Sequence, residues 1–410
     1  MKKIIALFLA TLFLLSLFAC ASDSGKDTSA PSTGGTATSN APPAQGSDKT
    51  SDAPPAQGSE NTPAPGTHVR AGYIDDDVDY FAREPYEFAF VHSSDISILF
   101  SLGAELKRLG SRFNYNLTSY SAQGDMDNFV SIIEVLVDQG IDGVIHSPYV
   151  ETYRRIYEVL EEANVPQLTP LSSFMDEQGR NMIPVVLSDG YKSGELLADW
   201  VLDNYKEFFG DIDLSKAGLI TVSLSIDRDI QARADGGKNR FLERQPDFAN
   251  RVFEIDMSDT GFSIQDGFNK AATIYAANAN IDHWFIISGS EEWGVGTLRA
   301  AESIGISENV VLTTVGSVIA LSGEWDDPGN SPSWRAVTPE YTPQYAAIGA
   351  AALVALRDGR ATFKTLWLDE PQLESDFASR YYIPNEVIPR ATYKDYIARM
   401  DVLYGRVGLD

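Results

Sequence analysis

Residues that could carry out catalysis or bind a metal are scattered through this sequence. Four histidines stand singly, with no pair at the i, i+4 spacing of a helical zinc site: His68, His92, His146 and His283. The chain contains no G-x-S-x-G nucleophile elbow and no GxxxxGK phosphate loop. Glu291 and Glu292 are neighbours at an expected helix start, where adjacent side chains do not face each other. The sequence therefore predicts no enzyme activity, no cofactor and no metal.

Polar side chains, many of them hydroxyls, gather at positions directly after the predicted buried strands. In open parallel sheets, ligands bind beyond the carboxyl ends of the strands, so these side chains are expected to line a site. The set is Ser93, Ser94, Asp95, His146, Ser147, Tyr149, Ser172, Ser173, Ser188, Asp189, Asp227, Asp229, Arg233, Ser290, Glu291, Glu292, Ser317, Thr338 and Glu340. A glycoside hydrolase, the alternative from another class, needs two carboxylates roughly 5–10 Å apart. The strand ends offer Asp95, Asp229, Glu291 and Glu340 for such a pair.

The elements that position these residues alternate between strand and helix. Short apolar runs rich in β-branched and aromatic residues predict the strands, and longer stretches of helical period predict the helices. The first series has strands at 87–92, 114–120, 142–147, 165–171 and 182–188, and helices at 99–110, 126–140, 151–164 and 190–208. The second has strands at 216–224, 251–257, 283–288 and 309–316, and helices at 230–244, 264–278 and 292–305. A further strand and helix are expected within 333–359. This alternation predicts an α/β fold with two parallel sheets, each flanked by helices.

The chain begins with a leader and a polar tether. Residues 1–19 combine Lys2 and Lys3 with an apolar run that is too short to span a bilayer comfortably, as in a signal peptide. Residues 20–67 are rich in Ser, Thr, Pro and Gly and repeat APPAQGS, a composition that predicts disorder. The formal net charge of −26 argues against nucleic acid or an anionic membrane surface as a partner. The single cysteine, Cys20, excludes an intrachain disulfide.

Two parts of the sequence resemble known bacterial proteins. The stretch Leu17-Phe18-Ala19-Cys20 is similar to a lipobox, which implies cleavage before Cys20 and a lipid on its sulfur. "DIQARADGG" (229–237), "HWFIISGSEEWGVGTLRAAESIG" (283–305) and "AVTPEYTPQYAAIG" (336–349) resemble the arabinose- and ribose-binding branch of the type I periplasmic binding proteins. That resemblance implies two lobes joined by three hinge crossings. Lobe one would comprise 86–187 and 341–383, and lobe two 188–340 and 384–410.

The resemblance also assigns ligand contacts. Arg233 falls on an arginine that binds sugar oxygens, and its guanidinium has five donors in a fixed fork. Phe100 falls on an aromatic that stacks on the sugar ring, with Trp293 and Tyr149 as further candidates. The remaining expected contacts are Ser93, Asp95, Ser147, Ser172, Ser188, Asp229, Ser290 and Glu291. Several carboxylates of the family are absent, their positions being held by Leu171 or Ser172, Gly316 and Ile319. This absence predicts a less hydroxylated or modified carbohydrate, or one bound largely through hydroxyls and water.

The expected function is that of a lipid-anchored, extracytoplasmic subunit for sugar transport. It would be a monomer that binds a monosaccharide or related polar solute and delivers it to an ABC permease. The alternative is the input subunit of a sugar-sensing system, in which the ligand-bound state is passed to a histidine kinase or chemoreceptor. The sequence does not separate these two.

Overall fold

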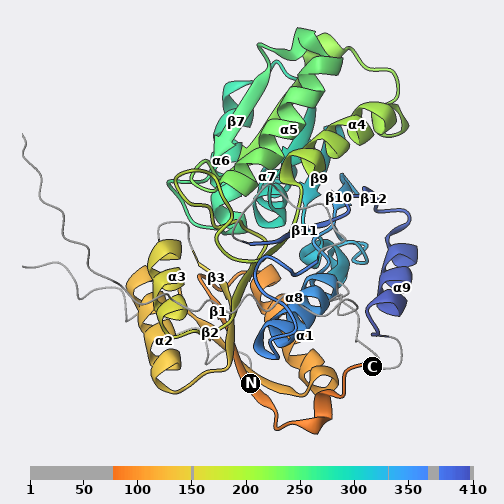
Figure 1. Ribbon diagram of the computed structural model, residues 1–410. Helices are drawn as coiled ribbons and strands as arrows, with labels where there is room; N and C mark the ends of the chain where they lie inside the picture. Colours follow the sequence, from red (N-terminus) through yellow and green to blue (C-terminus); the bar gives the residue numbers. More distant parts are fainter. Residues whose placement is uncertain (1–76, 149–151, 331, 368–377, 407–410) are drawn as a thin grey trace, which may run out of the picture. The chain divides into compact units, whose positions relative to one another are not determined.

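The alternation of strands and helices builds two sheets flanked by helices, as the sequence predicts, and each sheet has six strands. The computed structural model describes residues 77–148, 152–330, 332–367 and 378–406. The predicted signal peptide, Cys20, the tether and Tyr149 lie outside these residues. Figure 1 shows the elements of both sheets with the helices that cover them.

The first sheet is wholly parallel and has the strand order β11-β5-β4-β3-β1-β2. Its strands are β1 (Tyr86–His92), β2 (Tyr115–Ser121), β3 (Gly143–Ser147), β4 (Gln167–Pro170), β5 (Val185–Ser188) and β11 (Arg380–Ile383). Its helices are α1 (Ser97–Phe113), α2 (Met126–Asp138), α3 (Tyr153–Glu162) and α8 (Thr342–Arg357). The order of β1 to β5 in the sheet is that of doubly wound folds, which bind ligands where the strand order reverses, between β1 and β3.

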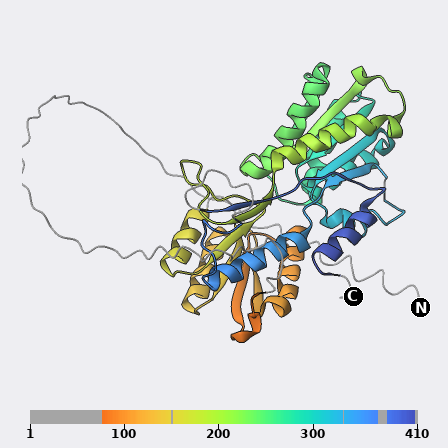
Figure 2. The same ribbon diagram turned by 45° about the vertical axis from the view of Figure 1, so that its right-hand side comes forward.

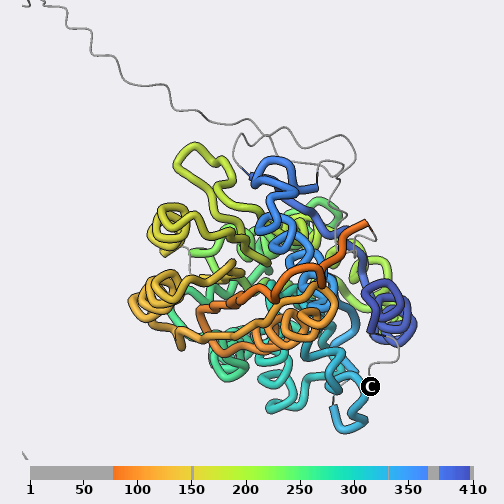
Figure 3. Tube along the Cα trace, turned by 60° about the horizontal axis from the view of Figure 1, so that its bottom comes forward, coloured from red at the N-terminus to blue at the C-terminus, as the bar shows by residue number. Residues whose placement is uncertain are grey.

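Strand β1 supplies apolar side chains to both faces of this sheet. Phe88 and Phe90 pack in the core beneath α1 and α8, whereas Ala89 and Val91 pack beneath α2 and α3. This alternation follows from the two-residue period of a strand, and burial on both faces explains why β1 reads as one continuous apolar run. Figure 1 shows α2 and α3 on one side of the sheet and α1 and α8 on the other. Figure 3 shows α8, in blue, running beside the orange segment of α1 although the two are far apart in sequence.

The second sheet repeats the same topology with the order β12-β10-β9-β8-β6-β7. Its strands are β6 (Ala217–Ser223), β7 (Val252–Asp256), β8 (His283–Ser288), β9 (Val310–Val315), β10 (Trp334–Thr338) and β12 (Ile388–Pro389). Its helices are α4 (Gly190–Phe209), α5 (Arg228–Arg244), α6 (Ile264–Ala277), α7 (Glu291–Ser303) and α9 (Tyr393–Leu403). The expectation of a wholly parallel sheet is wrong for β12, which pairs antiparallel with β10. β12 is a two-residue edge strand that follows β11 directly after the last crossing of the chain. No helix stands between the two strands to form the crossover that parallel pairing requires.

Helices α4 and α5 lie side by side on one face of the second sheet (Figure 2). Their approach requires glycine, since a Cβ on Gly194 would lie 2.0 Å from the carbonyl oxygen of Arg233. A Cβ on Gly236 would likewise lie 2.0 Å from the carbonyl oxygen of Tyr191. Both glycines are in helix interiors, where glycine costs roughly 1 kcal/mol relative to alanine. Close packing offsets this cost and holds the start of α5 against α4.

The chain passes between the two sheets three times. It leaves the first sheet after β5, returns from β10 to α8, and crosses again between β11 and β12. The carboxyl ends of β1, β3, β4, β6, β8, β9 and β10 thereby bring their following loops to one pocket.

Candidate functional site

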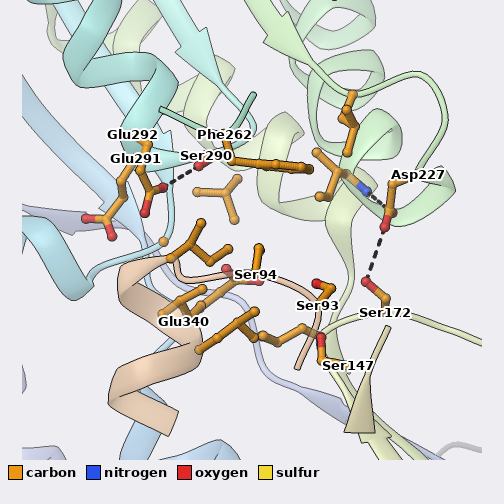
Figure 4. A pocket seen from close by; sticks show the side chains of 18 of the residues that line it. Ser93, Ser94, Ser147, Ser172, Asp227, Phe262, Ser290, Glu291, Glu292 and Glu340 are labelled. Atoms are coloured by element: carbon orange, nitrogen blue, oxygen red, sulfur yellow. Dashed lines mark hydrogen bonds between the residues drawn. The ribbon is translucent and has the colours of Figure 1, made fainter. Parts of the chain in front are cut away.

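A pocket opens where the loops after these strands meet (Figure 4). The empty space at this pocket is about 940 Å³ with the open mouth included. The first sheet contributes Ser93 and Ser94 after β1, Ser147 and Pro148 at the end of β3, and Leu171 and Ser172 after β4. The second contributes Leu224, Ile226 and Asp227 after β6, Ser290 after β8, Val315 and Gly316 from β9, and Glu340 after β10. Both sheets therefore supply their strand ends to a single site.

Apolar side chains form much of the pocket wall. Phe262 stacks on Trp293 with ring centroids 5.5 Å apart and an interplanar angle of 28°. Figure 4 shows Phe262 lying across the site, between the corner formed by Glu291 and Glu292 and that formed by Asp227. The aliphatic residues around it are Ile96, Ile98, Leu99, Pro148, Leu171, Leu224, Ile226, Ile230 and Val315. An aromatic face among aliphatic walls suits the apolar side of a ring-shaped solute.

Arg233 lies in the pocket wall, but its guanidinium is already paired. Nη2 donates to Glu340 Oε1 at 2.5 Å, and Nη1 donates to the carbonyl oxygen of Gly289 at 2.8 Å. Both side chains are buried, with 7% and 6% of their surface exposed. Burial raises the pKa of Glu340, and the charge of Arg233 opposes that shift. Nε of Arg233 is buried and has no hydrogen-bond partner among the described residues.

The carboxylate of Glu291 caps a backbone turn instead of being free to bind a ligand. Its carboxylate accepts hydrogen bonds from the N–H groups of Ile319 and Ala320, at 3.0 and 2.9 Å, where the short π-helix Ala320–Glu324 begins. Gly316 leaves the room for this contact, because a Cβ there would lie 2.9 Å from Cγ of Glu291. Burial, with the neighbouring charge of Glu292, raises the pKa of Glu291 to about 8.

Glu292 and Asp227 join the two halves of the pocket. Glu292 accepts hydrogen bonds from Ser97 of α1 and from Ser290, both at 2.6 Å. Asp227 is the N-cap of α5 and also accepts a bond from Ser172 at 3.3 Å (Figure 4). Burial raises the pKa of Asp227, and the backbone N–H of Ile230 opposes the shift. Each carboxylate therefore contacts a hydroxyl from the opposite sheet's loops.

The structure brings six of the ten predicted ligand contacts into the pocket lining. These are Ser93, Ser147, Ser172, Arg233, Ser290 and Glu291. Trp293 also lines it, although its side chain is fully buried.

Four predicted contacts lie elsewhere, each for a local reason. Asp95 accepts a hydrogen bond from Ser121 at the end of β2. Asp229 accepts one at 2.6 Å from the backbone N–H of Ser173. Ser188 ends β5 in register with Ile383 of β11 and is buried there. Phe100 is 54% exposed and meets the ring of His92 edge-on, because the neighbouring residue Leu99 takes the pocket-facing side of α1.

Sequence reasoning missed the apolar half of the site. It considered only polar residues after strands, although Leu224, Ile226 and Val315 occupy the same kind of position. Phe262 had no such signal, since it lies between β7 and α6, beyond the turn that follows the strand. Glu340 was among the strand-end residues, but nothing in the sequence paired it with Arg233.

The described residues contain no group of His, Cys, Asp or Glu that could hold a metal ion. His146, expected among the strand-end residues of the site, is instead a core histidine. It contacts Gln167 at 3.0 Å, and burial lowers its pKa to about 4. In the described part of the chain, no helix has the length and hydropathy needed to cross a membrane.

Comparison with known proteins gives matches in structure only. No protein-family model and no curated protein sequence matches the chain. An ABC transporter periplasmic solute binding protein from Actinobacillus succinogenes 130z, with bound D-allose, has a TM-score of 0.59 and 15% identity over 76% of this chain and 100% of that chain. A solute binding protein of Bacillus halodurans C-125 with bound myo-inositol has a TM-score of 0.60 and 14% identity, covering 77% and 98%. The arabinose-binding component from Shewanella sp. ANA-3 has a TM-score of 0.57 and 16% identity, covering 78% and 97%. At these identities, the likeness establishes the fold.

Proposed function

From the fold of a type I periplasmic binding protein, which this chain has, we propose that it is a solute-binding subunit for an ABC importer. It captures a sugar or sugar-like solute between its two lobes, outside the cytoplasm, and presents the ligand-bound state to a membrane permease. One observation carries the proposal: a single pocket is lined by the strand ends of both sheets. The sugars bound by structural neighbours are consistent with this ligand class.

The site would act by binding alone. Each pocket carboxylate already accepts hydrogen bonds from the protein, Glu340 from Arg233, Glu291 from backbone N–H groups and Glu292 from serines. A solute that contacts both sets of strand ends binds the closed arrangement of the lobes more tightly than any open one. This difference in affinity is the free energy that shifts the protein toward closure.

Thermal unfolding of the full-length protein with pentoses, hexoses, polyols, nucleosides and amino acids tests the proposal. A ligand at one hundred times its dissociation constant should stabilise the folded state by about 2.7 kcal/mol. We expect a sugar or polyol to do so, and to be recovered chemically unchanged. Phe262→Ala should remove most of the shift because it removes the aromatic face of the pocket. Phe100→Ala is the matched control outside the pocket and should keep the shift. Stabilisation by an amino acid or nucleoside alone would contradict the sugar assignment.

We further propose that a lipid on Cys20 anchors the protein to the bacterial membrane. The support is the sequence Leu17-Phe18-Ala19-Cys20, which is similar to a lipobox. Two acyl chains at one residue give stable anchoring, whereas one is marginal. Metabolic labelling with a fatty acid should mark the wild-type protein, and Cys20→Ala should remove the label and release the protein from the membrane fraction. Equal labelling of both proteins would contradict the anchor.

A further inference from the structure

The charges that line the pocket are strongly unequal. Four acidic residues line it, Asp227, Glu291, Glu292 and Glu340, and Arg233 is the sole cation among the lining residues that the structure describes. Because Arg233 is paired with Glu340, it leaves the other three carboxylates without a positive side chain. An anionic solute would therefore be repelled.

Glu292 is the pocket carboxylate whose charge is least neutralised by the protein. Its two oxygens each accept one hydroxyl, from Ser97 and from Ser290, and no ion pair of the described residues involves it. Hydroxyls satisfy its lone pairs but do not neutralise its charge. The N-terminus of α7 contributes roughly half an elementary charge, which is shared between Glu291 and Glu292. Burial raises the pKa of Glu291 to about 8, and proton uptake there removes one charge and leaves that of Glu292.

The surroundings of Glu292 favour binding of a cation there. Ile96, Ile98 and Val315 line the same pocket, and their apolar surface lowers the local dielectric constant and strengthens a charge–charge contact. Ser97 belongs to α1 and Glu292 to α7, so an amine bound at Glu292 lies where elements of the two sheets meet.

We propose that the solute is a sugar or polyol that carries a protonated amino group, with Glu292 as its counter-ion. This inference rests on the proposed function and names the substrate class of the same site. The amine takes the place of a serine donor at Glu292, and the ring lies against Phe262.

Matched ligand pairs test the amine. Binding of D-glucosamine and D-glucose, and of D-galactosamine and D-galactose, is compared by titration calorimetry with the full-length protein at about pH 6.5, below the ordinary pKa of an amine. The N-acetyl derivatives keep the nitrogen but carry no charge. We expect at least one amino sugar to bind about tenfold or more tightly than both its hydroxyl and its N-acetyl counterpart, and its affinity to fall with added salt.

Two variants assign the effect to Glu292. Glu292→Gln keeps the size and hydrogen-bonding capacity of the side chain and should abolish the preference for the amine. Glu308→Gln makes the same change of net charge at an exposed position of the same lobe and should preserve it. Equal binding of amino and neutral sugars overturns this inference and leaves sugar capture standing. Failure of every sugar, amino or neutral, overturns the proposed function and this inference with it. A preference for the amine that survives in Glu292→Gln overturns the role given to Glu292.

Discussion

Replacing Glu340 with alanine is expected to lower the free energy of unfolding by about 3–5 kcal/mol. The variant leaves the guanidinium of Arg233 buried without its ion-pair partner, with a hydrogen bond to the carbonyl oxygen of Gly289. Urea unfolding followed by tryptophan fluorescence measures the loss, because Trp293 and Trp334 are buried in the lobe that contains Arg233.

Two controls separate this effect from the loss of any ion pair. Arg399 and Glu386 form the same kind of pair at the surface, with 53% and 41% of their side chains exposed. Glu386→Ala should cost at most about 1 kcal/mol. The double variant Arg233→Met with Glu340→Leu removes both buried charges and should recover much of the stability lost in Glu340→Ala. If Glu340→Ala costs no more than Glu386→Ala, the burial argument is wrong.

The second large effect is a dependence of stability on pH that comes from Glu291. Burial raises the pKa of this carboxyl from 4.5 to about 8 in the folded protein. Between these values the folded state holds a proton that the unfolded chain has lost. The contribution of Glu291 is therefore fully present below pH 4.5 and is lost as the pH rises toward 8, with a slope of at most about 1.4 kcal/mol per pH unit.

The variant Glu291→Gln isolates this contribution. It cannot titrate, so the difference in unfolding free energy between wild type and variant should shrink steadily, or change sign, from about pH 5 to 8. The amide also turns a donor toward the N–H groups of Ile319 and Ala320, which costs about 1–3 kcal/mol at every pH. Denaturant unfolding across this pH range measures both the pH-dependent contribution of Glu291 and the constant cost of the amide. Parallel curves for the two proteins would show that Glu291 titrates normally.

The sequence predicted the sheets because local patterns determine them. The apolar run 283–288 indicates a strand buried on two faces, and the helical period of 190–208 indicates a helix buried on one face. Both patterns can be recognised without knowing which element each one packs against. The position of the site followed from the same information. In a parallel α/β fold, residues after strands meet at one edge, which placed Ser93, Ser147, Arg233 and Ser290 at the pocket.

The direction of individual side chains did not follow from their position. Phe100 and Leu99 are neighbours on α1, yet at 3.6 residues per turn they face about 100° apart, and only Leu99 reaches the pocket. Asp229 and Asp227 differ by two residues at the start of α5; Asp227 lines the pocket and Asp229 binds the backbone of Ser173. A shift of one residue in the start of a helix therefore decides which of two nearby side chains reaches the pocket.

The sequence by itself determined the fold class, the edge of the sheets where the pocket opens, and the excess of negative charge. Only the tertiary structure decided which charges remain available there. Arg233 and Glu340 are separated by 107 residues and pair because Glu340, directly after β10, lies beside Arg233 of α5. The close contact of α5 with Gly194 of α4 holds α5 in place. The pair neutralises Arg233, the one cation among the described pocket residues, and leaves Glu292 with two serine hydroxyls. Coulomb energy depends on distances in space, and sequence periodicity does not encode those distances between elements far apart in the chain.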